Sequence, residues 1–150
     1  MKFKAISSLL ASGLCAAVLA GDQVPISPVL YFDAQKVAAA FAKSAPLVVT
    51  DKFKVQTGNR TTPGEVEIHE WDTDVFYIME GSATFVTGGV AVDPKQTAPG
   101  ETRAVRISGG KERRLAKGDV IVIPNRVPHW FKKVHGHMIY FAVKVTDSSR

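Results

Sequence analysis

From Leu47 onward, short runs of β-branched and aromatic residues alternate with turns rich in Gly, Pro, Asn and Asp. The turns recur about every ten residues, a spacing that is typical of all-β sandwiches and barrels. Strands are predicted near residues 47–49, 53–57, 65–69, 75–80, 83–87, 103–107, 112–115, 120–123, 129–134 and 138–145. Gly81 and Gly136 are expected to form turns between strands, and residues 93–100 the longest irregular loop.

One short helix is predicted before the strands, over residues 33–43. Asp33 is a plausible N-cap, the interior is rich in alanine, and Pro46 prevents the helix from continuing. The length of 150 residues, with 45% apolar and 22% charged residues, fits one compact globular domain. We therefore expect an N-terminal arm with a short helix over residues 21–46 and a β-barrel domain over residues 47–150.

Residues 1–20 have the features of a secretory signal peptide. Lys2 and Lys4 precede an apolar stretch with small residues near its end, and cleavage is expected after Ala20. Lipid attachment at Cys15 is an alternative, which the bulky Leu14 before it disfavours. The protein is expected to be secreted or periplasmic, with no membrane attachment after cleavage.

Removal of this segment also changes the charge and the available chemistry. The 19 Lys and Arg residues fall to 17, against 14 Asp and Glu, so the formal net charge falls from +5 to +3 and does not imply nucleic-acid binding. Cys15 is the only cysteine. The mature chain would therefore contain no disulfide, no cysteine zinc ligand and no thiol nucleophile.

Glu67 and His69 alternate with Val66 and Ile68 in a predicted strand. Because successive strand side chains point to opposite faces, Glu67 and His69 share one face, and Val66 and Ile68 are expected to point outward. Asp74 follows shortly after, and a second block over residues 118–129 gives a strand, a proline-containing turn and a histidine.

Together the two blocks resemble the cupin superfamily. The first cupin motif reads Gly, five residues, His, one residue, His, three or four residues, Glu, six residues, Gly. His69 falls on its second histidine, Asp74 on its glutamate and Gly81 on its closing glycine, whereas Glu67 replaces the first histidine and Thr61 the opening glycine.

The second cupin motif reads Gly, five residues, Pro, one residue, Gly, two residues, His, three residues, Asn. Gly118, Pro124 and His129 match it, whereas Arg126 replaces the glycine and Lys133 the asparagine. The two matches together cover about half of the chain. The resemblance implies an all-β double-stranded β-helix, or jelly-roll, barrel.

The resemblance also implies a divalent metal site inside the barrel. Its ligands would be Glu67, His69, Asp74 and His129. Imidazole and carboxylate ligands suit Fe, Mn, Zn, Ni or Cu. If no metal were bound, mutual repulsion would raise the pKa of either Glu67 or Asp74 and make this pair a candidate acid or base.

We expect a substrate pocket lined by Trp71, Phe76, Ile78, Phe131, Tyr140 and Arg60. The leading functional hypothesis is an exported, metal-dependent enzyme of the dioxygenase, isomerase or lyase type that acts on a small organic molecule. The alternative is a non-enzymatic cupin that binds a small ligand, with or without metal.

Many cupins are dimers, so a homodimer is expected, in which the arm or the second copy covers Val66 and Ile68. His135 and His137 are expected to be solvated surface residues.

Overall fold

The computed structural model describes residues 28–147. The predicted signal peptide, its cleavage site and the first residues of the arm lie outside this range. The chain divides into two units, residues 1–30 and 31–150, and the helix and strands described below all belong to the second. Within residues 28–147, no helix has the length and apolarity needed to cross a bilayer.

The predicted helix is confirmed as α1 (Ala34–Lys43). The Asp33 carboxylate accepts a hydrogen bond of 2.8 Å from the backbone N–H of Lys36, as expected of an N-cap. The helix ends at Ser44, which has a left-handed backbone (φ 48°). Phe41 anchors α1 to the barrel by edge-on packing against Phe141, with ring centroids 4.8 Å apart.

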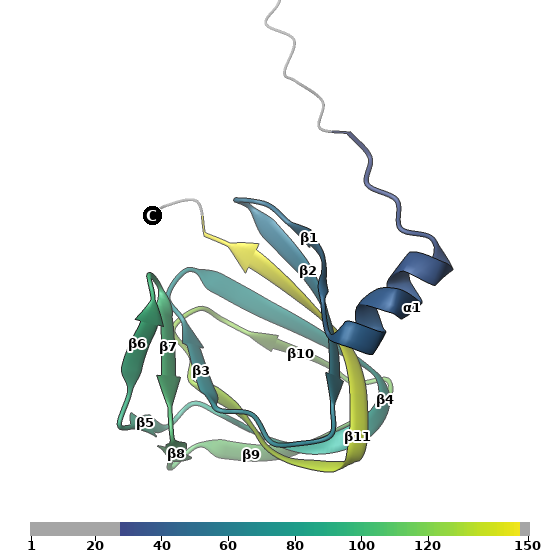
Figure 1. Cartoon of the computed structure of the whole chain (residues 1–150). Helices are drawn as coiled ribbons and strands as arrows, with labels where there is room; N and C mark the ends of the chain where they lie inside the picture. Colours follow the sequence, from purple (N-terminus) through teal and green to yellow (C-terminus); the bar gives the residue numbers. More distant parts are fainter. Residues whose placement is uncertain (1–27, 148–150) are drawn as a thin grey trace, which may run out of the picture. The chain divides into compact units, whose positions relative to one another are not determined.

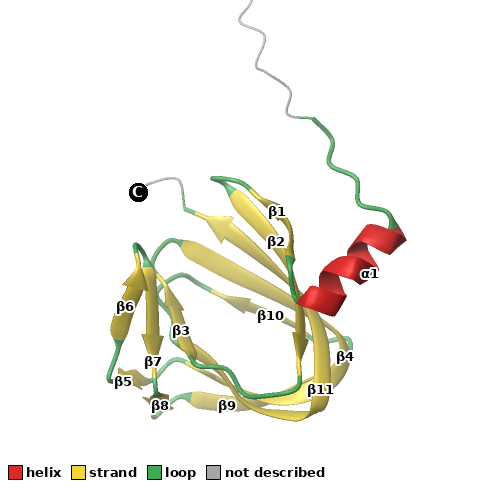
Figure 2. Ribbon diagram, viewed as in Figure 1, coloured by secondary structure: helices red, strands yellow, loops and turns green. Residues whose placement is uncertain are grey.

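In the described part of the chain, eleven strands follow the helix. They are β1 (Pro46–Val49), β2 (Phe53–Arg60), β3 (Val66–His69), β4 (Asp72–Thr87), β5 (Val90–Val92), β6 (Lys95–Ala98), β7 (Glu101–Ala104), β8 (Arg106–Ser108), β9 (Lys111–Ala116), β10 (Val120–Ile123) and β11 (His129–Thr146). Nine belong to one antiparallel sheet that curls around an interior, and β5 pairs with β8 separately (Figures 1 and 2). The predicted all-β barrel with one short helix is confirmed.

The two longest strands correct the predicted turns. Residues 75–80 and 83–87 belong to the single strand β4, and residues 129–134 and 138–145 to the single strand β11. Gly81 and Gly136 have φ angles of 74° and 84°, and the pairing of β4 with β11 shifts register between Val134 and Met138. Irregular strands and turns both favour glycine at positive φ, so these glycines mark places where the strands bend rather than end. The predicted loop over residues 93–100 likewise contains β6.

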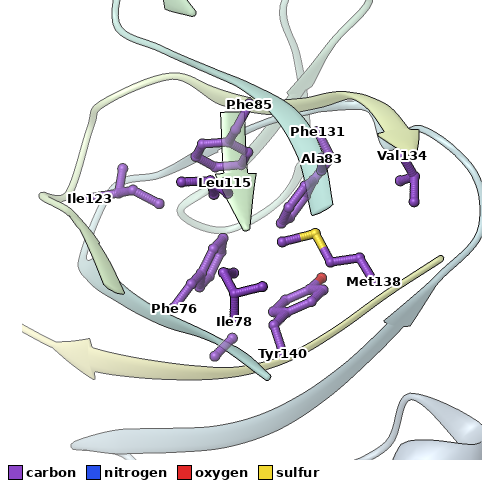
Figure 3. Packing of buried hydrophobic residues seen from close by; sticks show 11 residues of the cluster. Phe76, Ile78, Ala83, Phe85, Leu115, Ile123, Phe131, Val134, Met138 and Tyr140 are labelled. Atoms are coloured by element: carbon purple, nitrogen blue, oxygen red, sulfur yellow. The ribbon is translucent and has the colours of Figure 1, made fainter. Parts of the chain in front are cut away.

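The core lies inside the barrel (Figure 3). It consists of Phe76, Ile78, Ala83, Phe85, Leu115, Ile123, Phe131, Val134, Met138, Tyr140 and Ala142. Asp74, Phe76 and Ile78 all face inward, as strand alternation predicts. Val66 is expected to be covered by the arm or a second copy, but its side chain is already fully buried within the described part of the chain. Its strand is flanked on both sides, with Ala104 and Trp130 as register partners.

Phe85 is fully buried among Phe76 and Phe131. We expect Phe85→Ala to lower the free energy of unfolding by about 3–5 kcal/mol, since it removes buried apolar area and leaves a cavity. The control is Val90→Ala on β5, a residue that is 69% exposed and whose replacement should cost much less. Urea unfolding measures both changes. Equal losses would contradict the assigned core.

Candidate functional site

Three strands bring the predicted ligands together. Glu67 and His69 lie on β3, Asp74 on β4 and His129 on β11. His129 is the register partner of Glu67 across the β3–β11 pair. His69 Nε2 lies 3.5 Å from Glu67 Oε2 and 3.4 Å from Asp74 Oδ2, and His129 Nε2 lies 3.5 Å from Asp74 Oδ2. The residues that the motifs single out therefore converge on one point inside the barrel.

Lys144 occupies the centre of this group, and the sequence analysis missed it. Its Nζ donates to both carboxylate oxygens of Asp74 at 2.8 Å and lies 2.8 Å from His69 Nε2. Lys144 and Asp74 are register partners in the β4–β11 pair, and both are buried. Strand alternation gives the missed signal, because Lys144 shares the inward face of β11 with Tyr140 and Ala142.

Glu101 fixes the orientation of the His69 ring. His69 Nδ1 donates to Glu101 Oε2 at 2.8 Å, and Arg103 Nη1 donates to the same oxygen at 3.0 Å. A carboxylate only accepts, so Nδ1 carries the hydrogen and Nε2 faces the centre. This arrangement resembles the carboxylate–histidine pairs that orient metal ligands in proteins. The motif comparison did not identify Glu101, because it lies on β7, outside both motifs.

His129 has an unsatisfied nitrogen that faces the same centre. Its Nδ1 lies 3.0 Å from the carbonyl oxygen of Val127 and donates to it. Its Nε2 is therefore the unprotonated atom. That atom is buried and has no hydrogen-bond partner among the residues that the structure describes. Burial also lowers the pKa of His129, which keeps the ring neutral and its lone pair available.

The carboxyl groups at the centre are ionised. Burial alone would raise the pKa of Glu67, but the hydrogen bond with His69 and the charge of Arg103 outweigh it and lower the pKa to about 2. For Asp74, burial is likewise outweighed by His69 and Lys144, and the pKa is lowered. The expected raised pKa in one member of this pair is therefore not found, because cationic groups lie around both carboxylates.

The protonation of His69 depends on the carboxylates and on the Lys144 ammonium around it. Burial and the charge of Lys144 lower the pKa of His69, whereas its contacts with Asp74, Glu101 and Glu67 raise it. A protonated Nε2 has no lone pair to accept from Lys144. His69 Nε2 therefore either carries a proton toward the carboxylates or accepts from the lysine. Its distance of 2.8 Å from the ammonium, against 3.4 and 3.5 Å from the carboxylate oxygens, is that of an acceptor from Lys144.

A cavity of about 440 Å³ opens beside the centre. Four of the predicted pocket residues line it, namely Arg60, Phe76, Phe131 and Tyr140. The other two lie elsewhere. Trp71 borders a neighbouring cavity of about 150 Å³, and Ile78 lies in the core with no exposed surface.

Two guanidinium groups flank Glu67 at the edge of this cavity. Arg60 Nη2 lies 3.6 Å from one Glu67 oxygen and Arg103 Nη2 lies 3.6 Å from the other. Arg60 is held by its Nε donating to the Tyr140 hydroxyl at 2.9 Å and by the Phe131 ring, whose centroid lies 5.0 Å from its guanidinium carbon. These contacts hold Arg60 in place, and both arginines line the cavity.

Arg126 keeps the backbone geometry of the glycine that it replaces in the second motif. Its φ is 64°, in the left-handed region that glycine adopts most readily. Its backbone N–H donates to the carbonyl oxygen of His69 at 2.7 Å, which ties the turn before His129 to the strand that carries His69. Its side chain lies at the surface, 3.4 Å from Glu70.

Comparison with known proteins assigns the family. The cupin family model matches residues 33–149, and the chain belongs to the cupin family. An uncharacterized conserved protein with a double-stranded beta-helix domain from Klebsiella pneumoniae matches with a TM-score of 0.50 and 14% identity, over 71% of this chain and 78% of that one. TT1209 from Thermus thermophilus matches with a TM-score of 0.50 and 16% identity, over 68% of this chain and 80% of that one.

A likeness at this level of identity shows the double-stranded β-helix fold and no more. DMSP lyase DddQ from Ruegeria pomeroyi aligns with a TM-score of 0.47 and 16% identity, over 67% of this chain and 42% of that longer protein. No curated protein matches the chain in sequence.

The side chains at the centre fit a divalent metal ion, on one condition. Glu67, His69 and His129 each offer a ligand atom within 4.8 Å of the others. Two imidazoles and one carboxylate are a ligand set that binds divalent transition metals, and the unsatisfied His129 Nε2 is an acceptor that such an ion would complete. The condition is that His69 Nε2 gives up its contact with Lys144.

Proposed function

We propose that this cupin is an enzyme that acts on a small anionic organic molecule, with a divalent metal ion bound by Glu67, His69 and His129. The observation that carries the metal assignment is the buried Nε2 of His129, which has no hydrogen-bond partner within residues 28–147 and lies near the other ligands. A metal ion held there supplies Lewis-acid chemistry toward a substrate oxygen.

The chain's own side chains support an anionic substrate. The cavity is lined by Arg60, Arg103 and Lys144, and each guanidinium has donors that no other described group accepts at hydrogen-bond distance. Guanidinium groups bind carboxylates with paired hydrogen bonds. Phe76 and Phe131 supply an apolar wall to the same cavity, which suits the carbon skeleton of a small organic acid.

Tyr140 is a candidate proton donor to the substrate. Its hydroxyl accepts from Arg60 Nε at 2.9 Å, so its own hydrogen is free to point into the cavity. Burial raises the pKa of Tyr140, which keeps this proton in place at neutral pH. Glu67 and Asp74 are ionised and would act as a ligand and a charge partner rather than as acids.

A metal-free binding protein is the second candidate, and Lys144 is the observation that favours it. Its ammonium already neutralises Asp74 and contacts His69. In that case the cavity would capture an anionic ligand without chemistry. Metal content separates the two candidates.

The metal assignment predicts a loss of binding on removal of either histidine. His69→Ala and His129→Ala should each weaken metal affinity by at least about 100-fold, because even groups that only orient a ligand typically contribute 10–100-fold. The matched controls are His135→Ala and His137→Ala, exposed histidines that contact Thr84 and Glu80. Elemental analysis after equilibration with each of the five candidate metals measures occupancy. Metal retained in both site variants would contradict the proposal.

The substrate assignment predicts a preference for carboxylates over the matching amides. Arg60→Gln and Arg103→Gln should each weaken the binding of small carboxylates about tenfold or more, because a hydrogen bond between charged groups contributes about 1.5–3 kcal/mol. Arg126→Gln is the control, since Arg126 lies outside the cavity. Calorimetric titration with a panel of small carboxylates and their amides measures this. Equal affinity for acids and amides would exclude an anionic substrate.

We further propose that the protein is exported and forms a homodimer. Export is supported by the N-terminal sequence alone. Dimerisation is supported by exposed apolar side chains on the outer faces of β4 and β10, namely Tyr77, Val120 and Val122, where Tyr77 and Val120 are register partners. Sequencing of the N-terminus of the mature chain tests the first proposal, and light scattering the second.

A further inference from the structure

Lys144 and a divalent cation require the same lone pair. His69 Nε2 has one lone pair, and the Lys144 ammonium lies 2.8 Å from it. We propose that Lys144 is a built-in competitor for the metal site, so that its ammonium and a divalent ion are alternative occupants of the same position. This inference rests on the proposed metal site and concerns its regulation.

The ammonium is held firmly in place. It donates to both oxygens of Asp74, whose side chain is only 1% exposed. A buried carboxylate without a partner is strongly destabilising, so Asp74 requires a cation beside it at all times. Lys144 supplies that cation when no metal is bound. The barrel interior can therefore keep its shape without metal, unlike sites that fold only around their ion.

The ammonium also removes the electrostatic attraction for a second cation. Around the centre, the charges of Glu67, Asp74 and Glu101 are matched by those of Lys144, Arg60 and Arg103. A divalent ion entering this balanced group meets no surplus negative charge, and at close range a neighbouring unit charge repels it strongly. Lys144 thus weakens metal binding in two ways, by holding the lone pair of His69 and by cancelling the charge of Asp74.

The experiment compares Lys144→Met with the wild-type protein in titrations with Zn(II) and Mn(II). Methionine has a similar length and no charge. Lys144→Met should bind metal at least about tenfold more tightly, because both forms of competition are removed. Its melting temperature should be lower than that of the wild type without metal and should rise more on metal addition, as the ion takes over the neutralisation of Asp74.

Lys54→Met is the matched control. Lys54 borders the same cavity, and its ion pair is with a different buried aspartate, Asp72, at 2.6 Å. Its replacement should lower the melting temperature without raising metal affinity. Equal gains in affinity from both substitutions would overturn the inference, since they would reflect the charge of the cavity in general.

The double variant Lys144→Met with Asp74→Asn keeps the experiment decisive if the single variant does not fold. It removes the ion pair as a unit and leaves the net charge unchanged. Its metal affinity should lie between those of the wild type and Lys144→Met, because only the competition for His69 is lifted. Affinity no higher than that of the wild type would overturn the inference.

The outcomes also separate this inference from the proposed function. Tight binding in Lys144→Met but none in the wild type supports the competition and favours the metal-free candidate for the natural protein. Equal, stoichiometric binding in both overturns the competition and leaves the metal site intact. Absence of binding in every variant overturns both.

Discussion

The ion pair between Lys144 and Asp74 fixes the interior of this cupin. Two charges so deeply buried are tolerated only when they satisfy each other, and Lys144 donates to both oxygens of Asp74. The pair is also a register pair of β4 and β11, the two longest strands. A slip of one residue would turn Lys144 outward and leave Asp74 alone in the barrel. This contact therefore favours the observed alignment of the two strands, together with the apolar residues that share their inward faces.

The sequence predicted those parts of the molecule that depend on local alternation and spacing. The helix cap at Asp33 and the inward face of Asp74, Phe76 and Ile78 follow from short stretches of chain, whereas the convergence of the two motifs was implied by the resemblance to cupins. Lys144 and Glu101 lie outside both motifs, and their roles arise from pairing between strands far apart in sequence. For Lys144 the sequence does contain a signal, because alternation places this lysine on the inward face of an otherwise apolar strand.

The turns predicted at Gly81 and Gly136 were wrong for a related reason. A glycine at positive φ permits a hairpin turn or a bend within a strand, and only the partner strand decides between them. Here β4 and β11 pair with each other along almost their whole length, so each continues through its glycine and curves around the core (Figure 1). Sequence alternation alone contains no information about that partner. The burial of Val66 depends in the same way on its neighbours Ala104 and Trp130.

Glu67 connects the two halves of the proposed site. Its carboxylate is a candidate ligand beside His69, and it is also flanked by Arg60 and Arg103 at the cavity. A histidine at this position, as in the cupin motif, would be neutral and would remove the carboxylate that both guanidinium groups flank. The charge of the Glu67 carboxylate is therefore balanced by the two arginines, as the charge of Asp74 is balanced by Lys144. Each of these carboxylates has cations beside it, and that pairing keeps a centre rich in carboxylates stable inside an apolar barrel.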